Sequence, residues 1–171
     1  LHAQADVNIV YSHVGWSPDS KYICFSRNEI TNTTPRRSRS DIYIARPDGS
    51  EMRKITGDNG NESFPDWARD GKTIYFGSGS PGSREAEIFS IRTDGTMLTP
   101  LTRSPGRDGA PVVSPDGKLI AFNSERDGGL PQIYVMRTDG SEPRRLTEDD
   151  KAAFYNPVWS PNGKRIVYYR E

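Results

Sequence analysis

Residues 16–26 read WSPDSKYICFS, and close variants of this stretch occur three more times in the chain. The variants are WARDGKTIYFGS at 67–78, VSPDGKLIAFNS at 113–124 and WSPNGKRIVYY at 159–169. A catalytic motif needs to occur only once in a chain, whereas a motif that recurs four times indicates a structural unit that recurs with it. The architecture therefore has to be derived before any function.

Three markers follow one another in the same order within each unit. The turn triplets that start at Ser17, Ala68, Ser114 and Ser160 lie 51, 46 and 46 residues apart. The other two markers are an Asp-Gly pair (Asp48-Gly49, Asp94-Gly95, Asp139-Gly140) and a closing pair (Ile55-Thr56, Leu101-Thr102, Leu146-Thr147). Periods of about 40–50 residues are typical of propeller blades and related repeat arrays.

Local patterns within a unit predict strands. Apolar and polar residues alternate over 118–122, 72–76 and 164–168, which is the period of a half-buried strand. The next strand is β-branched and aromatic (42–44, 88–90, 133–135) and ends at Asp-Gly, a common short turn. No stretch has a helical period. An outer strand that ends in Leu-Thr would complete each unit.

A sheet with apolar residues on both faces has to lie between copies of itself, which is the arrangement in a β-propeller. We predict an all-β chain with about three and a half blades of four antiparallel strands, in one domain over 1–171. The blades are expected at about 7–56, 62–102, 109–147 and, incompletely, 154–171. Closed propellers have about 4–8 blades. We therefore expect either part of a longer propeller or a homo-oligomer whose copies complete a ring.

The repeat resembles that of TolB-type β-propellers, a relative of the WD repeat. The resemblance is carried by NPVWSPNGKRIVYY at 156–169, QIYVMRTDGSEPRRLT at 132–147 and SPDGKLIAF at 114–122. It implies a propeller over nearly the whole chain. For function it implies less, because the same repeat occurs in periplasmic TolB, which binds protein partners, in peptidases related to prolyl oligopeptidase and in oligogalacturonide lyases.

Composition excludes several classes of function. The chain has 171 residues with 23 basic and 23 acidic side chains, so its net charge favours neither nucleic acid nor a lipid surface. No apolar run approaches the roughly 20 residues of a membrane-spanning helix, so we expect no membrane insertion. Ala3-Gln4-Ala5 is similar to the end of a signal-peptide cleavage site. We expect a periplasmic or secreted protein, with a cytoplasmic one as the alternative.

Few residues offer catalytic chemistry. His2 and His13 are the two histidines and Cys24 is the single cysteine, which we interpret as structural side chains rather than metal ligands or a nucleophile. No Gly-x-Ser-x-Gly elbow is present, and the Asp-Gly acids lack calcium-loop spacing. The glycine-rich segment 77–82 is not followed by Lys-Ser/Thr, so it does not predict a phosphate loop. We expect no catalytic residues, no metal and no cofactor.

The unequal spacing of the units points to a binding surface. The first unit is longer by five residues, and the excess lies in the predicted loop 30–40. In a propeller this loop and the links between blades open on one face, and longer loops on one face often bind partners. The candidate residues are Arg36, Arg37, Arg39, Arg84, Arg103, Arg107 and Arg126. A solvated charged rim, neutralised by Glu85, Glu87, Asp108 and Asp127, is the alternative interpretation.

These features lead us to expect a non-enzymatic, TolB-like propeller that acts as a protein–protein interaction scaffold in a bacterial envelope. The alternatives are a module that binds carbohydrate or a small ligand, or the propeller remnant of a polysaccharide lyase or peptidase. Self-association to complete a ring is a further possibility that the sequence leaves open.

Overall fold

In the computed structural model, the structure describes residues 7–31, 37–57, 60–80 and 82–171, and these form strands and turns without a helix. The strands are β1 (Val7–Trp16), β2 (Ile23–Thr31), β3 (Arg37–Ala45), β4 (Arg53–Lys54), β5 (Asn61–Trp67), β6 (Thr73–Gly79), β7 (Glu87–Arg92), β8 (Thr99–Pro100), β9 (Asp108–Val113), β10 (Leu119–Ser124), β11 (Gln132–Arg137), β12 (Arg144–Arg145), β13 (Phe154–Trp159) and β14 (Ile166–Arg170). Among these residues no helix has the length and apolar character needed to cross a bilayer.

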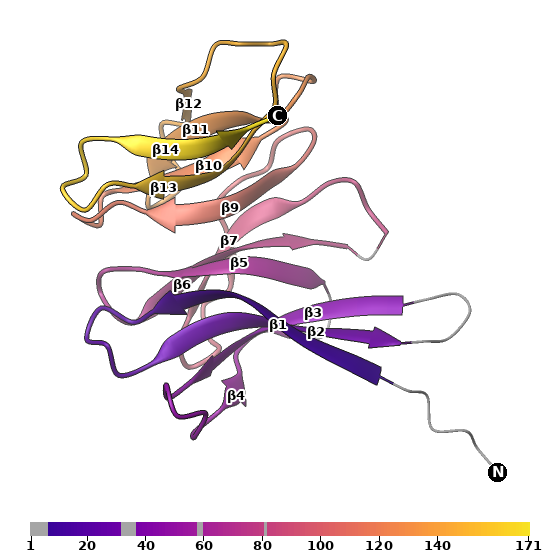
Figure 1. Cartoon of the computed structure of the whole chain (residues 1–171), viewed down its shortest axis with the longest axis vertical. Coiled ribbons are helices and arrows are strands. Elements are labelled where there is room, and N and C mark those ends of the chain that lie inside the picture. Colours follow the sequence, from indigo (N-terminus) through magenta and orange to yellow (C-terminus); the bar gives the residue numbers. More distant parts are fainter. Residues whose placement is uncertain (1–6, 32–36, 58–59, 81) are drawn as a thin grey trace.

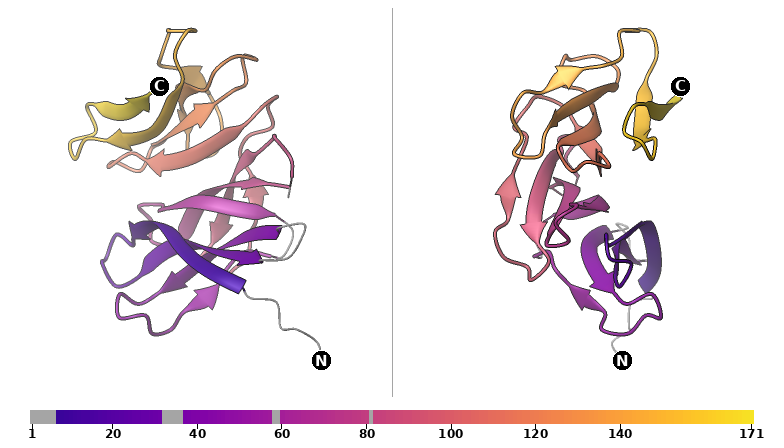
Figure 2. Two further views of the ribbon diagram at one scale, coloured as in Figure 1. Left: turned by 45° about the vertical axis from the view of Figure 1, so that its right-hand side comes forward. Right: turned by 90° about the vertical axis from the view of Figure 1, so that its left-hand side faces the viewer.

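Consecutive strands pair antiparallel, so each unit of the sequence folds into its own sheet. β1 to β4, β5 to β8 and β9 to β12 make three four-stranded blades, and β13 and β14 make half of a fourth. Figure 1 shows the sheets stacked along the long axis, and Figure 2 (right) shows them on an arc with the first and last blades toward the same side. The predicted all-β array of about three and a half propeller blades is confirmed.

Neighbouring blades meet at three equivalent joints, where the third strand of one blade touches the inner strand of the next. At the first joint Ser40 bridges to Asn61, and at the second Ala86 bridges to Arg107, both in parallel. At the third joint the Phe154 N–H donates to the Pro131 carbonyl oxygen at 2.7 Å. Because each joint holds few backbone bonds, packing between the sheets has to keep the blades together.

The recurring Ser-Pro-Asp stretch forms a hydrogen-bonded turn between the first two strands of a blade. In the third blade the Ser114 hydroxyl donates to Asp116 at 2.6 Å and accepts the Leu119 N–H at 3.0 Å. The same bonds recur in the first and fourth blades around Ser17 and Ser160. The stretch therefore recurs because each blade uses the same turn.

The structure corrects two details of the predicted blades. The outer strands end before the closing Leu-Thr pair, and Ile55 adds only one bond from its N–H to the Ile42 carbonyl oxygen at 2.9 Å. The five additional residues of the first unit lengthen a hairpin rather than only a loop, because β2 and β3 pair up to Thr31 and Arg37. Residues 32–36 of the predicted loop lie outside the described residues.

The core lies between the sheets and is built from equivalent positions of successive blades. The first interface buries Cys24, Ile42, Ile44, Ile55, Trp67, Ile74, Phe76 and Ile91, and the second buries Ala68, Tyr75, Ile88, Val113, Ile120, Phe122, Tyr134 and Met136. Burial of one such aliphatic or aromatic side chain contributes about 1.5–3 kcal/mol. Because successive side chains of a strand point to opposite faces of its sheet, a blade contributes apolar side chains to the interfaces on both of its sides.

Cys24 is part of this core, as the sequence predicts. It is fully buried, and its thiol faces the Pro65 carbonyl oxygen at 3.7 Å. Burial raises the pKa of the thiol, with the charge of Asp66 acting in the same direction. A buried thiol held in its protonated form is a packing group and a poor nucleophile.

Candidate functional site

The two long edges of the array differ in the connections that they carry. The turns β1–β2 and β13–β14 lie on one edge, and the end of β2 and the start of β3 lie on the opposite edge (Figure 1). Because the strands alternate in direction, the β6–β7 and β10–β11 connections and the links between blades share that opposite edge. We call it the loop side, and the edge with the Ser-Pro-Asp turns the turn side.

Two of the predicted partner-binding arginines form ion pairs within the loop side. Arg39 Nε lies 3.2 Å from Asp41 Oδ2, and Lys54 reaches the other oxygen of the same carboxylate at 2.9 Å. Arg126 donates to the buried Asp108 carboxylate at 2.9 Å and lies over the rings of Phe122 and Tyr134. These contacts give both arginines a structural role that the sequence did not indicate.

Three other candidates come together at the second joint. Arg107 bridges Ala86, which lies two residues after Arg84, and Arg103 precedes the same joint by four residues. The Glu125 N–H donates to the Arg107 carbonyl oxygen at 3.0 Å, which brings the β10–β11 connection to the same place. The side chains of Arg84, Arg103 and Arg107 are exposed, and no ion pair joins them to another described residue. We call these three residues the arginine cluster.

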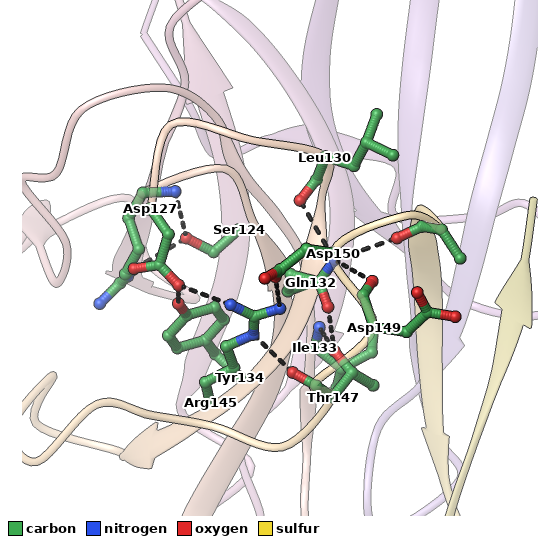
Figure 3. Close-up of polar contacts among 12 residues, drawn as sticks. Ser124, Asp127, Leu130, Gln132, Ile133, Tyr134, Arg145, Thr147, Asp149 and Asp150 are labelled. Carbon is green, nitrogen blue, oxygen red and sulfur yellow. Dashed lines mark hydrogen bonds and ion pairs between the residues drawn. The ribbon is translucent and has the colours of Figure 1, made fainter.

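The acids predicted to neutralise this surface have other partners. Asp108 pairs with Arg126, and Asp127 lies 3.2 Å from Arg145 and accepts the Tyr134 hydroxyl (Figure 3). Glu87 accepts the Thr102 hydroxyl at 2.5 Å and the Ser104 N–H at 3.0 Å. Glu85 is exposed. Asp108, Asp127 and Glu87 are therefore engaged outside the arginine cluster, and Glu85 is the carboxylate that lies next to Arg84 in the chain.

Some of the predicted residues fall where little can be described. Arg36, His2 and the Ala3–Ala5 segment lie outside the described residues. Arg37 starts β3 opposite Thr31, but its side chain also lies outside them. The predicted surface that the structure can describe is thus centred on the second joint and not on the long first hairpin.

Sequence reasoning missed a layer of buried carboxylates at the joints. The buried Asp41 and Glu62 face each other across the first joint, and the half-buried Glu87 and the buried Asp108 occupy the equivalent positions at the second. Burial, and next the charge of Asp41, raises the pKa of Glu62 to about 7. Burial also raises the pKa of Glu87. Asp41 and Glu87, like Glu62 and Asp108, lie 46 residues apart in the chain, and this recurrence of acids was the signal that would have found them.

At the third joint an amide replaces the carboxylate. Gln132 accepts the Thr147 hydroxyl at 2.8 Å, and its amide donates to the carbonyl oxygens of Ala152 at 3.0 Å and Asp149 at 3.2 Å (Figure 3). Because an amide both donates and accepts, this joint satisfies its polar groups without charge. The charged joints are therefore the first and the second.

The first strands of the four blades carry bulges at equivalent positions. His13, Phe64, Ala110 and Asn156 have φ between 49° and 54°, in the left-handed region, and line a cavity of about 400 Å³. The His13 ring packs on Phe64 with 3.7 Å between centroids, and burial lowers the pKa of the imidazole. His13 thus packs in the wall of this cavity.

Blades of four antiparallel strands around a bulged central wall define a β-propeller. A family model described as the TolB beta propeller domain matches residues 82–171, more than half of the chain. The chain therefore belongs to the TolB beta propeller domain family.

Individual relatives agree with this assignment. TolB from Acinetobacter baumannii superposes with a TM-score of 0.73 at 26% identity, over 94% of this chain and 37% of that one. A protein assigned as TolB in Agrobacterium tumefaciens gives 0.69 at 25% identity, over 95% and 70%. The uncharacterized peptidase YuxL of Bacillus subtilis (strain 168) is 43% identical over 44 residues, which are 26% of this chain and 6% of the peptidase. The chain thus spans well under half of the A. baumannii protein and a small part of the peptidase.

Proposed function

We propose that the chain is a non-enzymatic TolB-like propeller module that binds a protein partner in a bacterial envelope, with the arginine cluster as the contact surface. The observation that carries this proposal is the convergence of Arg84, Arg103 and Arg107 at the second joint, exposed and without an ion pair to another described residue. Arginine is favoured at interfaces because its planar guanidinium binds carboxylates with two hydrogen bonds. The partner is therefore expected to present acidic residues.

The two side chains that carry most reactivity support a non-enzymatic role. Cys24 is buried with its thiol pKa raised, and His13 packs on Phe64 with its imidazole pKa lowered. The contacts of both side chains are internal, with the Pro65 carbonyl oxygen for Cys24 and with the Phe64 ring for His13.

Charge reversal of the cluster tests this proposal. A chain with Arg84→Glu, Arg103→Glu and Arg107→Glu is compared with one carrying Lys21→Glu, Lys118→Glu and Lys164→Glu on the turn side. Immobilised proteins are incubated with an envelope extract, and bound proteins are identified by mass spectrometry. We expect a partner that binds the unmodified chain and the turn-side variant but not the cluster variant.

Other results would decide against the proposal. A partner retained equally by both variants would place the contact elsewhere. Retention of an acidic oligosaccharide, with no protein lost from the cluster variant, would favour the carbohydrate-binding alternative. Turnover of a substrate by the purified chain would contradict the non-enzymatic assignment.

A further inference from the structure

A second feature of the loop side is an acidic cavity beside the first joint. The cavity has a volume of about 390 Å³ and lies between the link that follows β4 and the strands β6 and β7. Glu62, Glu85 and Glu87 line it, and none of the described residues that line it is a lysine, arginine or histidine. Its charge is thus opposite to that of the arginine cluster.

Glu62 is the residue that points to a ligand. Its side chain is only 6% exposed, and Oε1 accepts a long bond of 3.3 Å from the Ser78 hydroxyl. Its other oxygen, Oε2, has no hydrogen-bond donor among the described residues. A buried carboxylate oxygen normally has a partner, because an unsatisfied charged acceptor costs more than a neutral one. Glu62 thus lines the cavity while part of the hydrogen-bonding capacity of its carboxylate stays unused.

The groups around Glu62 carry an excess of negative charge. Asp41 on β3 faces Glu62 and opposes its ionisation, whereas Lys54 on β4 favours it. The Lys54 ammonium lies 2.9 Å from Asp41, so much of its charge is matched to that carboxylate. Glu85 and Glu87 add further acidic groups along the wall. A cation that enters the cavity would therefore meet an excess of negative charge.

A glycine packs directly against the acidic end of the cavity. A Cβ atom placed on Gly60 would lie 2.5 Å from Glu62 Oε1 and 2.6 Å from the Ser78 hydroxyl oxygen. A side chain at this position would therefore displace both polar groups. Gly60 thus allows the Glu62 carboxylate to keep its place in the cavity wall.

The remaining walls select the kind of cation. Phe76 and Phe89 stack with 6.0 Å between centroids, and Ala86 and Leu98 also line the cavity. Apolar and aromatic walls suit an aliphatic stem and attract a cationic head group. The described residues contain no group of three His, Cys, Asp or Glu placed to hold a metal ion. The lining therefore fits an organic cation better than a divalent metal.

We propose that this cavity binds a cationic side chain, lysine or arginine, of a peptide, and that Glu62 accepts its N–H donors. The proposal adds to the proposed function a second contact for a protein partner, of opposite charge to the first. Small amino-acid probes test it without any partner, so its failure leaves the test of the arginine cluster unaffected.

Nuclear magnetic resonance titration of the 171-residue chain provides the test. The probes are Nα-acetyl-arginine N-methylamide, the corresponding lysine compound and the neutral citrulline compound. We expect the two cationic probes to shift the backbone amide resonances of Ser78 and Glu87, and the citrulline probe to leave them unchanged. Arginine binding alone would assign the cavity to a guanidinium, and lysine binding alone to an ammonium.

Two variants and a matched control define the role of Glu62. Glu62→Gln keeps the shape but removes the charge, and it should weaken binding about tenfold or more, because charged hydrogen bonds are the stronger ones. Gly60→Ala keeps the charge but displaces the Glu62 carboxylate and the Ser78 hydroxyl, and it should weaken binding as well. Glu148→Gln removes an exposed acid on another blade and should change nothing. Thermal unfolding of each variant confirms that it is folded.

The proposal fails if Glu62→Gln binds the cationic probes as tightly as the unmodified chain. Equal binding of the citrulline probe would show that charge is not recognised. No shift with either cationic probe, or the same shifts produced by calcium chloride instead, would also overturn it.

Discussion

The closing threonine of each blade has a role that its polarity explains. Thr56, Thr102 and Thr147 each accept the N–H of an isoleucine in the third strand, at 3.0, 2.9 and 3.0 Å. These N–H groups are buried and have no strand partner on that side. The hydroxyl therefore replaces a backbone bond at the point where the outer strand has ended.

Thr147→Val is expected to destabilise the chain by about 1–3 kcal/mol, because it leaves the Ile133 N–H without an acceptor in the core. Gln132 would also lose the hydroxyl donor at 2.8 Å (Figure 3). Urea denaturation monitored by tryptophan fluorescence measures the change. Thr99→Val, at an exposed position, is the control and should alter the free energy of unfolding little.

Glu62 gives the chain a predictable dependence on pH. Its pKa is raised from an ordinary value of 4.5 to about 7, so the folded state binds this proton more tightly than the unfolded state. The resulting stabilisation is complete below pH 4.5 and is lost as the pH rises through about 7. The free energy of unfolding therefore falls as the pH rises through about 7, and Glu62→Gln should remove the contribution of Glu62 to that fall. At pH 8 the variant should unfold at a higher urea concentration than the unmodified chain.

Urea midpoints at pH values from 4.5 to 8 measure this difference. Glu148→Gln should follow the unmodified chain throughout. If the urea midpoint of Glu62→Gln falls with pH as much as that of the unmodified chain, another group causes the fall.

At the residue scale, the sequence predicts those features that depend on neighbouring residues in the chain. The Asp-Gly and Ser-Pro-Asp turns and the packing role of Cys24 follow from neighbours in the chain, and the structure agrees. The roles of Glu62 and Arg126 do not, because their partners come from strands that only the fold brings near.

Among elements, the Asp-Gly turn does more than reverse the chain. Gly49, Gly95 and Gly140 all have φ near 85°, as the turn requires. A Cβ at Gly140 would lie 2.5 Å from the Leu101 carbonyl oxygen, and one at Gly95 would lie 3.3 Å from that of Ile55. Nothing lies within 4 Å of such an atom at Gly49. The turns of later blades thus press against the closing segment of the preceding blade.

Gly140→Ala should therefore destabilise the chain more than Gly49→Ala. Both substitutions place alanine in the left-handed region, which costs about 1–2 kcal/mol. Gly140→Ala adds a clash between blades of roughly 1–3 kcal/mol. Gly95→Ala should fall between them in denaturation midpoint. Equal denaturation midpoints for Gly140→Ala and Gly49→Ala would contradict this prediction. They would mean that the turn at Gly140 moves away from Leu101 without loss of stability.

The strands themselves were predictable because alternation and turn residues determine them locally. The outer strands were less so. Arg53–Lys54, Thr99–Pro100 and Arg144–Arg145 carry no alternating pattern, and only pairing with the third strand defines them. The lengthened first hairpin was mistaken for a loop because its polar residues 37–41 do not resemble a strand in isolation.

The whole molecule leaves an interface unfilled at each end. Trp16 is 56% exposed although the equivalent Trp67 is 2% exposed in the first interface. Val167 is 68% exposed although Tyr75 and Ala121 at its position are buried. The outer face of the first blade and that of the last are thus the two complementary halves of the interface that joins the other blades.

We expect the 171-residue chain to associate head to tail in solution, since each end offers the surface that the other end lacks. Light scattering should give a mass that rises with concentration above the 19.1 kDa of one chain. Val167→Lys, which places a charge in the exposed apolar face, should lower that mass. A constant 19.1 kDa at all concentrations would contradict this expectation.

The repeat was visible in the sequence at this scale because every blade uses the same turn. The grouping of three arginines at the second joint was not, since the seven candidates are spread over 91 positions from 36 to 126. Arg39 pairs with Asp41 and Arg126 pairs with Asp108, and these pairings depend on how the strands are placed in the folded array.

The sparse joints also bear on how such a chain changes over generations. Each blade is built from a continuous stretch of sequence, and a single bridged residue pair connects the first blade to the second and the second to the third. Three complete coding segments and a partial fourth in one gene favour unequal recombination, which would add or delete whole blades in frame. Because the junctions reuse the same geometry, a gene altered in this way would still encode well-formed sheets, and only the number of blades would differ.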